Sequence, residues 1–367
     1  MPESLEELRS KLRQYQDAYY NLDPIVSDSE YDTLLAIIKG MDPNAPELTT
    51  VGAPIPSHSV WDKVSHIIPM GSLEKVNTNI EFNEWASKIG TKEFFITHKI
   101  DGSSMELVYE NGILVRCISR GDGIIGEDVT VNINRVPGIP HKLPKPVSVI
   151  IRGEIVMFKE VFERLYSSEY ANPRNTAAGK VREKKNNGDD CENLSFLAYG
   201  LLDPDPPHTM FSLFCMLEMM GFKVPEHMSG SIESISNFFL ALSNKGREAL
   251  PYEIDGVVVS VNDLRLMEEL GDLNMRPRGQ IAWKFDSAKG ITPVVEVRWQ
   301  VGPSGRVTPV ADVEPVEIGG VTITSMSLHN LSIFRDLKLW KGCRVLVSRH
   351  GDVIPYIEKN MDLPEAV

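Results

Sequence analysis

The stretch "FFITHKIDGSSMELVYENG" (residues 94–112) decides the fold of the region around it. It opens with an apolar, β-rich run up to Lys99, and a second such run follows at 104–109. Runs of this length and composition are typical of buried strands. The "ENG" at 110–112 is a hairpin signal of the Asn-Gly type before a third run. We therefore predict antiparallel strands here, with the charged amine of Lys99 where a buried strand ends.

The same texture continues over residues 69–290, where short strand-like runs alternate with helical intervals. The predicted strands are 94–100, 104–109, 113–119, 147–157, 254–261 and 281–285. The predicted helices lie near 159–168, 211–220, 231–244 and 263–270. This mixture predicts an α+β domain with largely antiparallel sheets.

Both flanks of this region differ from it. Residues 1–68 contain two amphipathic patterns, at 4–20 with a capping box of Ser4 and Glu7, and from Ser27 to Gly40. From residue 291 to 367 the chain is almost wholly short β-rich runs, which predicts a small barrel. We expect a multi-domain α+β protein with domains at 1–68, 69–290 and 291–367.

Composition limits the class of protein. The 367 residues carry a net charge of −13, which argues against a general nucleic-acid coat protein. The four cysteines form no CxxC pair, and neither a signal peptide nor a membrane-spanning stretch is visible, so we expect a cytoplasmic protein without a metal cage. Two basic segments, 173–185 and 338–349, are either phosphate-binding patches or solvated faces.

One dinucleotide-type motif is a false lead. The "GDGIIG" at 121–126 matches GxGxxG, but the residues after it are β-branched and proline-rich where a helix should begin. No regular βαβ repeat follows either, so we reject a Rossmann domain.

Five short motifs place charged residues at the margins of predicted strands. In chain order they are "KIDG" (99–102), "SRGDG" (119–123), "RGEIVM" (152–157), "IDGVVV" (254–259) and "WKF" (283–285). If they converge on one cleft, an amine beside other cations has a lowered pKa and can act as a nucleophile at neutral pH. A carboxylate can hold a ribose hydroxyl, and the remaining cations can neutralise a phosphoryl group during its transfer.

These motifs, in this order, resemble the NAD-dependent DNA ligases of the nucleotidyltransferase superfamily. Further blocks agree: "YENGILVRCISRGDGIIGEDVTVN", "ANPRNTAAGKVR", "EIDGVVVSVN", "VTPVADVEPV", "SLHN" and "GDVIP". The similarity covers nearly the whole chain. It implies a helical domain that binds nicotinamide mononucleotide (NMN), an adenylation domain and a C-terminal OB-fold.

The resemblance also implies roles for individual residues. Lys99 would be the nucleophile, with Asp101 and Gly102 completing its motif and Lys284 reaching the AMP phosphate. The other positions that it places at the dinucleotide are Tyr19, Tyr20, Asp28, Tyr31, Asp32, Thr97, His98, Arg120, Glu154 and Asp255. The basic residues expected at DNA phosphates are Arg174, Lys180, Arg182, Lys341, Arg344 and Arg349.

The activity implied is the sealing of nicks between a 5′-phosphate and a 3′-hydroxyl in duplex DNA, in replication and repair. A lysine–AMP intermediate and a DNA-adenylate would form, with release of NMN and AMP, and Mg²⁺ would assist. We expect a monomer that binds nicked DNA and NAD and no membrane. Two alternatives stay open, a ligase that joins RNA or uses another nucleotide donor, and a non-catalytic paralogue that binds nicks or NAD.

The sequence departs from the family pattern at several positions. Thr97 stands for a glutamate at adenine, Tyr20 for a histidine, Ser260 for a lysine of the adenylation step, and Pro303 for an arginine at the nick. Arg278 and Lys289 are candidates to replace the charge missing at 260. Family members also continue past the barrel with a zinc finger, helix-hairpin-helix repeats and a BRCT domain. This chain is therefore either a piece of a longer protein or a minimal ligase such as a phage would encode.

Overall fold

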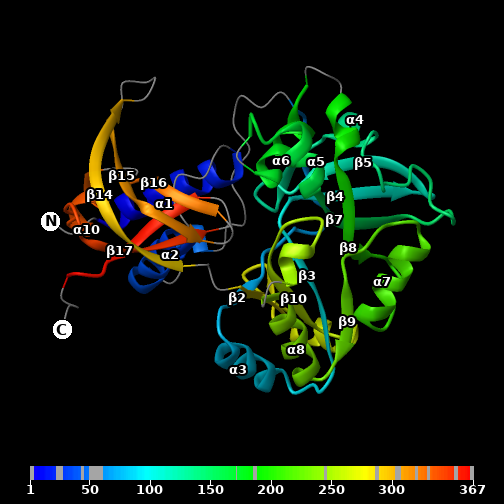
Figure 1. Ribbon diagram of the computed structural model, residues 1–367. Helices are drawn as coiled ribbons and strands as arrows, with labels where there is room; N and C mark the ends of the chain where they lie inside the picture. The colour runs from blue at the N-terminus through cyan, green and yellow to red at the C-terminus, as the bar shows by residue number, and fades with distance from the viewer. Residues whose placement is uncertain are drawn as a thin grey trace. The chain divides into compact units, whose positions relative to one another are not determined.

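The chain forms two compact units in a computed structural model (Figure 1). Residues 46–285 make up one unit, and residues 1–45 together with 286–367 make up the other. The structure describes the whole chain except residues 1–3, 22–27, 43–44, 49–60, 171, 185–187, 244–245, 286–288, 302–306, 319–320, 329–330, 351–353 and 364–367. The expected domain boundaries after residues 68 and 290 stay predictions.

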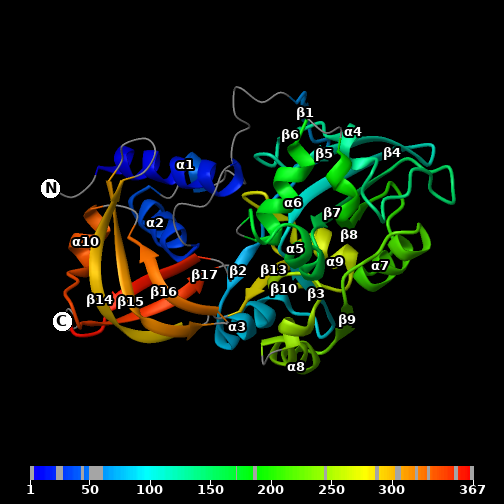
Figure 2. The same cartoon turned by 45° about the horizontal axis from the view of Figure 1, so that its top comes forward.

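The larger unit contains a five-stranded sheet, and two of its strands end at the "KIDG" and "WKF" motifs. Its strands, in spatial order, are β2 (Glu74–Val76), β13 (Gln280–Lys284), β10 (Ile254–Val261), β3 (Phe94–Ile100) and β9 (His227–Gly230). Every pair is antiparallel except β2 with β13. Helices α3 (Asn79–Ile89) and α8 (Ile232–Ser243) lie along this sheet in both views (Figures 1 and 2). Trp283 stacks between Phe82 of α3 and Phe239 of α8, which fixes both helices on that face.

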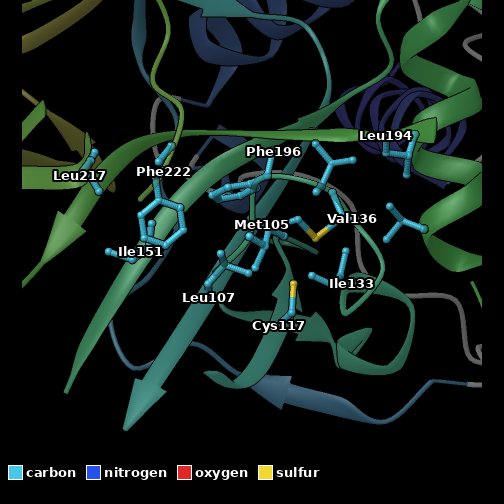
Figure 3. Close-up of a cluster of buried hydrophobic side chains, with 14 of the residues drawn as sticks. Met105, Leu107, Cys117, Ile133, Val136, Ile151, Leu194, Phe196, Leu217 and Phe222 are labelled. Carbon is cyan, nitrogen blue, oxygen red and sulfur yellow. The ribbon is translucent and has the colours of Figure 1, made fainter. Parts of the chain in front are cut away.

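A four-stranded antiparallel sheet forms the other half of this unit. Its order is β5 (Ile113–Ser119), β4 (Ser103–Glu110), β7 (Val149–Val156) and β8 (Ser195–Leu202). The β4–β5 hairpin turns at Asn111 and Gly112, which both have positive φ as the Asn-Gly signal predicted. Figure 3 shows the apolar cluster on one face of this sheet, where Met105, Leu107 and Phe196 are buried.

Short helices and strands complete the larger unit. They are β1 (Lys63–Ser65), β6 (Ile125–Glu127), α4 (Thr130–Ile133), α5 (Lys159–Leu165), α6 (Pro173–Arg182), α7 (Met210–Met219), α9 (Leu264–Leu270), β11 (Asp272–Leu273) and β12 (Arg276–Pro277). In the described part of this unit, 3₁₀ turns lie at Pro46–Leu48, Asp189–Asn193 and Gly246–Ala249.

The other unit holds the barrel strands and two N-terminal helices. The strand order is β16 (Val321–Ser327), β15 (Val307–Ile318), β14 (Lys289–Val301), β17 (Arg344–His350) and β18 (Ile354–Asn360). The edge strands β16 and β18 also contact each other, which curls the sheet, and α10 (Leu331–Leu337) lies within the segment after β16. The α+β class, the antiparallel sheets and the C-terminal barrel are confirmed.

Helices α1 (Leu5–Asn21) and α2 (Asp28–Met41) match the two amphipathic patterns. The Ser4–Glu7 capping box is present in both directions, since each backbone N–H bonds the other side chain, at 2.7 and 3.3 Å. The expected start of the second helix at Ser27 lies outside the described residues. Within the described part of the chain, no helix has the length and apolar character needed to cross a membrane.

Sequence patterns missed α3, α6 and β8. Two of these elements carried readable signals. Thr78 and Glu81 form a complete capping box before α3, and Asn172 caps α6 with Pro173 in its first turn. Helix α6 begins inside the basic segment that was interpreted by its charge alone.

Candidate active site

Two lysines face each other across one glycine in the five-stranded sheet. The register pairs Gly256 of β10 with Lys99 of β3 on one side and with Lys284 of β13 on the other. Residues directly opposite each other on neighbouring strands point to the same face of the sheet, so the two amines share one surface. A Cβ at Gly256 would meet the carbonyl oxygen of Trp283 at 2.3 Å, so only glycine lets the strands approach here.

Asp255 lies between the two amines. The β10–β3 register shifts between Ile254 and Gly256, so Asp255 sits at an irregularity rather than in the ladder. Both of its carboxylate oxygens accept from Lys99 Nζ at 2.8 Å, and Lys284 Nζ lies 3.4 Å from one of them. One carboxylate thus holds two cations, and the site keeps a net positive charge for an anion.

The loop after Lys99 packs tightly on the second sheet. A Cβ at Gly102 would meet the backbone oxygen of Ile155 at 2.3 Å and Cγ of Glu154 at 2.8 Å. The Asp101 carboxylate lies 3.1 Å from a guanidinium nitrogen of Arg174, the second residue of α6. The glycine therefore brings the lysine motif against Glu154, while α6 adds a further cation.

Glu154 is a buried carboxylate surrounded by cations. Its oxygens accept from Ser104 Oγ at 2.9 and 3.2 Å. Burial raises the pKa of Glu154 to about 7, although the charge of Arg120, the Ser104 bond and the charges of Arg174 and Lys99 all oppose that rise. The carboxyl group therefore changes protonation near neutral pH, beside the "KIDG" motif of Lys99.

A second buried network lies on the same face of the four-stranded sheet, at the next cross-strand pair of β4 and β7. Glu106 of β4 pairs with Arg152 of β7, next to the Ser104–Glu154 row. Arg152 donates to Glu106 Oε2 at 2.8 and 3.1 Å, and His66 Nδ1 lies 3.1 Å from Glu106 Oε1. The sequence analysis gave no role to His66 or Glu106. Two features of the sequence could have indicated this network. Glu106 is an acidic residue inside an apolar strand, and Arg152 lies two residues before Glu154.

Comparison with known proteins decides the family. The NAD-dependent DNA ligase adenylation domain matches residues 58–288, more than half of the chain. The chain belongs to the NAD-dependent DNA ligase family. The NAD-dependent DNA ligase OB-fold domain matches residues 291–364, and the DNA ligase-like N-terminal NAD⁺-binding domain matches residues 1–56.

Relatives named DNA ligase match along most of the chain. Those of Sorangium cellulosum, Acinetobacter baumannii and Halothermothrix orenii are 38%, 35% and 36% identical, each over 97% of this chain. The alignments cover 56%, 57% and 56% of these relatives, so the chain spans little more than half their length. A solved ATP-dependent DNA ligase from bacteriophage T7, in complex with ATP, covers 79% of this chain and 97% of its own at 12% identity, with a TM-score of 0.35. That likeness is too low to bear on function.

Two predicted nucleotide-binding residues lie on opposite faces of β3. Thr97 shares the face of Lys99, and its hydroxyl donates to the backbone oxygen of Glu226 at 3.1 Å. His98 points into the apolar core on the other face, where Nδ1 lies 3.0 Å from the Tyr252 hydroxyl. Burial lowers the pKa of His98 to about 4, so the ring is neutral. The side chain of His98 therefore does not line the surface that carries the lysines.

The departures from the DNA ligase pattern have different local settings. Ser260 is fully buried, and its Oγ accepts from Gln280 Nε2 at 3.0 Å. The Arg278 side chain is exposed, and Lys289 Nζ is held by Glu358 at 2.8 Å. Pro303 lies outside the described residues.

The predicted DNA-binding residues of α6 are held by neighbouring carboxylates. Lys180 is only 9% exposed, and its Nζ lies 2.7 Å from Asp190 and 3.3 Å from Glu183. Arg182 Nε lies 3.2 Å from Glu127. The amine of Lys180 is therefore an internal tie between α6 and the following turn in this structure.

The barrel supplies the other predicted DNA contacts. Lys341 is exposed at the turn before β17, whereas Arg344 donates to Asp362 at 2.6 and 2.9 Å. Arg349 lies on β17, but its side chain is outside the described residues.

Five predicted NMN-binding residues lie on α1 and α2: Tyr19, Tyr20, Asp28, Tyr31 and Asp32. Only the side chain of Tyr31 is described, and its hydroxyl accepts from Gln16 Nε2 at 3.0 Å. The positions of the other four side chains lie outside the described residues.

Proposed function

We propose that this chain seals nicks in duplex DNA with NAD as the nucleotide donor. The observation that supports it most is the cross-strand row of Lys99, Gly256 and Lys284, with Asp255 holding both amines. Attack on the phosphorus of an anionic phosphate group requires a nucleophilic amine and a second cation nearby that offsets the charge of the phosphoryl oxygens. The family match to an NAD⁺-binding domain at residues 1–56 favours NAD over ATP.

In the first step Lys99 attacks the adenylyl phosphorus of NAD. The Nζ–phosphorus bond forms, the phosphorus–oxygen bond to the NMN phosphate breaks, and NMN leaves with the electron pair. Lys99 must first lose a proton, and Asp255, which contacts Nζ with both oxygens, is the nearest group to accept it or pass it to solvent. Lys284 then faces the negative charge that develops on the phosphoryl oxygens.

Other residues would hold the nucleotide. Glu154 would accept a hydrogen bond from a hydroxyl group of the ribose. Arg120, whose charge acts on Glu154, would contact the nucleotide beside it. In the later steps a 5′-phosphate oxygen takes the AMP from Lys99, and the 3′-hydroxyl then displaces AMP to close the backbone. We place this work in replication and repair, in the cytoplasm, by a monomer.

We expect Mg²⁺ to bind at this site through the phosphate oxygens of the substrate and not through a set of protein ligands. The described residues contain no group of three or more His, Cys, Asp or Glu side chains that could hold a metal ion. Asp101 is paired with Arg174, and Asp255 with both lysines. Mg²⁺ usually keeps several waters and binds phosphate oxygens in such enzymes, where it would neutralise their charge.

The test is formation of a covalent AMP adduct. Wild type, Lys99→Ala and Lys99→Arg would each be incubated with NAD or ATP and weighed by mass spectrometry. We expect an adduct in wild type with NAD only. Lys99→Arg keeps a cation beside Asp255 but stays protonated, so it should fold and form no adduct. An adduct in Lys99→Ala, or none in wild type, would contradict the proposal.

Substrate choice needs a separate assay. Adenylated protein would be offered nicked DNA and nicked RNA of one sequence, and we expect sealing of DNA. Preferential sealing of RNA would instead support the RNA-joining alternative.

A further inference from the structure

The network of His66, Glu106 and Arg152 connects the segment at 63–70 to the nucleotide motif at Arg120. Strand β1 pairs with β6, from Lys63 opposite Glu127 to Ser65 opposite Ile125. Past the strand, the His66 N–H donates to the Ile124 carbonyl at 2.9 Å. The segment therefore runs along the loop that follows Arg120.

The backbone of Arg120 is held from both sides. Its N–H donates to the Ser104 carbonyl at 3.2 Å, and its carbonyl oxygen lies 3.1 Å from His66 Nε2. Ser104 is also the residue that donates to Glu154. Within the turn, the Gly123 N–H also donates to the Arg120 carbonyl, at 3.0 Å. The bond to Ser104 ties Arg120 to the strand beside Glu154, and the imidazole bond ties it to the segment at 63–70.

His66 faces two groups that only accept hydrogen bonds. Nδ1 meets the Glu106 carboxylate and Nε2 meets a backbone carbonyl, so each ring nitrogen can bond its partner only as a donor. The side chains of His66 and Glu106 are both fully buried, so water cannot replace either bond.

Arg152 fixes the other end of the network. Besides Glu106, its guanidinium donates to the carbonyl oxygens of Ile68 and Pro69. One arginine thereby ties the backbone beyond His66 to β7, two residues from Glu154. Buried networks with every partner satisfied hold a single geometry.

We propose that His66 is a positioning residue, which through its Nε2–H bond to the Arg120 carbonyl holds Arg120 in place for the nucleotide. Glu106 and Arg152 orient the imidazole for this bond. The inference deepens the proposed function and rests on it, because the nucleotide's place beside Arg120 and Glu154 is taken from there.

Two substitutions separate the two imidazole bonds. In His66→Asn the amide nitrogen takes the place of Nδ1 and keeps the Glu106 contact, but it cannot reach Arg120. In His66→Gln the amide nitrogen takes the place of Nε2 and keeps the Arg120 contact. Thr78→Ala, which removes the N-cap of α3 outside this network, serves as a control that is only less stable.

The rate of AMP adduct formation in a single turnover, the dissociation constant of NAD by calorimetry, and the Tm would be measured for each. We expect H66N to slow adduct formation on the order of 10- to 100-fold and to weaken NAD binding, because a shift of about 1 Å in a positioning contact has effects of that size. H66Q should stay within about 3-fold of the wild-type rate, although loss of the buried Glu106 contact should lower its Tm, and T78A should keep the wild-type rate.

Equal rates in H66N and H66Q, or a loss of rate in T78A as large as in H66N, would overturn the positioning role while the AMP adduct of wild type leaves the proposed function intact. No adduct in wild type would overturn both. If H66N does not fold, Arg152→Lys tests the other end, since a lysine cannot hold Glu106 and two carbonyls at once. An unchanged rate and NAD affinity in R152K would contradict the inference.

Discussion

The burial of Glu154, which we propose binds the ribose, lowers the stability of the fold above neutral pH. Burial raises its pKa to about 7, from an ordinary value of 4.5, against the opposing pull of Arg120 and Ser104. Between these values the folded chain keeps a proton that the unfolded chain has lost, so stability falls as pH rises through this window. A shift of this size corresponds to about 3 kcal/mol above neutral pH.

Glu154→Gln should therefore stabilise the fold while it weakens nucleotide transfer. The amide cannot ionise, so at about pH 8 we expect the free energy of unfolding to rise by up to about 3 kcal/mol, with little change near pH 4. AMP adduct formation should fall, because the amide replaces a charged acceptor for the ribose. Urea unfolding at both pH values measures the first effect, and a variant that is less stable than wild type at pH 8 would contradict it.

Glu106→Gln is the matched contrast. Burial alone would raise the pKa of Glu106, but the hydrogen bonds from His66 and Arg152 and their charges lower it overall. Its contribution to stability is therefore present above its ordinary pKa and is lost as pH falls. We expect Glu106→Gln to lose about 3 kcal/mol at pH 8, since it leaves Arg152 without its charged partner.

At the scale of elements, strand alternation accounts for most of what the sequence could predict about the site. The motifs located Lys99, Asp255 and Lys284 at strand margins. The register brings the two lysines together, and the irregularity in β10 puts Asp255 in contact with both. The same period of two could have placed the His98 side chain on the face opposite Lys99, but the prediction followed the family motif instead. His66 could not be found in this way, because its partners lie 40 and 54 residues away and no local pattern encodes such pairs.

The setting of Ser260 on β10 predicts the effect of restoring a lysine there. Thr97 pairs with Val258 and Phe95 with Ser260, so Thr97 and Ser260 are diagonal neighbours on one face of the sheet. Such neighbours lie about 7–8 Å apart, within reach of long side chains. Because Ser260 is fully buried, a lone amine at this position would lack a partner.

We expect Ser260→Lys to destabilise the fold by about 3 kcal/mol or more, because it buries an unpaired charge. Thr97→Glu together with Ser260→Lys should recover about 1–3 kcal/mol of this loss as a coupling energy between the two side chains. A double-mutant cycle by urea unfolding measures both quantities. If Ser260→Lys is as stable as wild type, or if the two effects simply add, the argument from the strand register fails.

At the scale of the whole molecule, the proposed DNA substrate must approach a chain of net charge −13. The cations that bind phosphate must then be those whose charge is exposed, and exposure separates two of the predicted contacts. Lys341 is exposed beside the barrel, whereas Lys180 is 9% exposed with its ammonium between Asp190 and Glu183. A lysine held by two carboxylates has no net charge to offer a phosphate.

The salt dependence of binding to nicked duplex DNA distinguishes them. Each phosphate neutralised by a lysine adds about 0.9 to the slope of log K against log salt, through counterion release. We expect Lys341→Ala to lower the magnitude of this slope by about 0.9. Lys180→Met should leave the slope unchanged while lowering the Tm, because it leaves two carboxylates without their cation. Fluorescence anisotropy from about 50 to 200 mM salt gives the slopes, and a loss of slope in Lys180→Met equal to that in Lys341→Ala would mean that the buried amine leaves its carboxylates to meet the DNA.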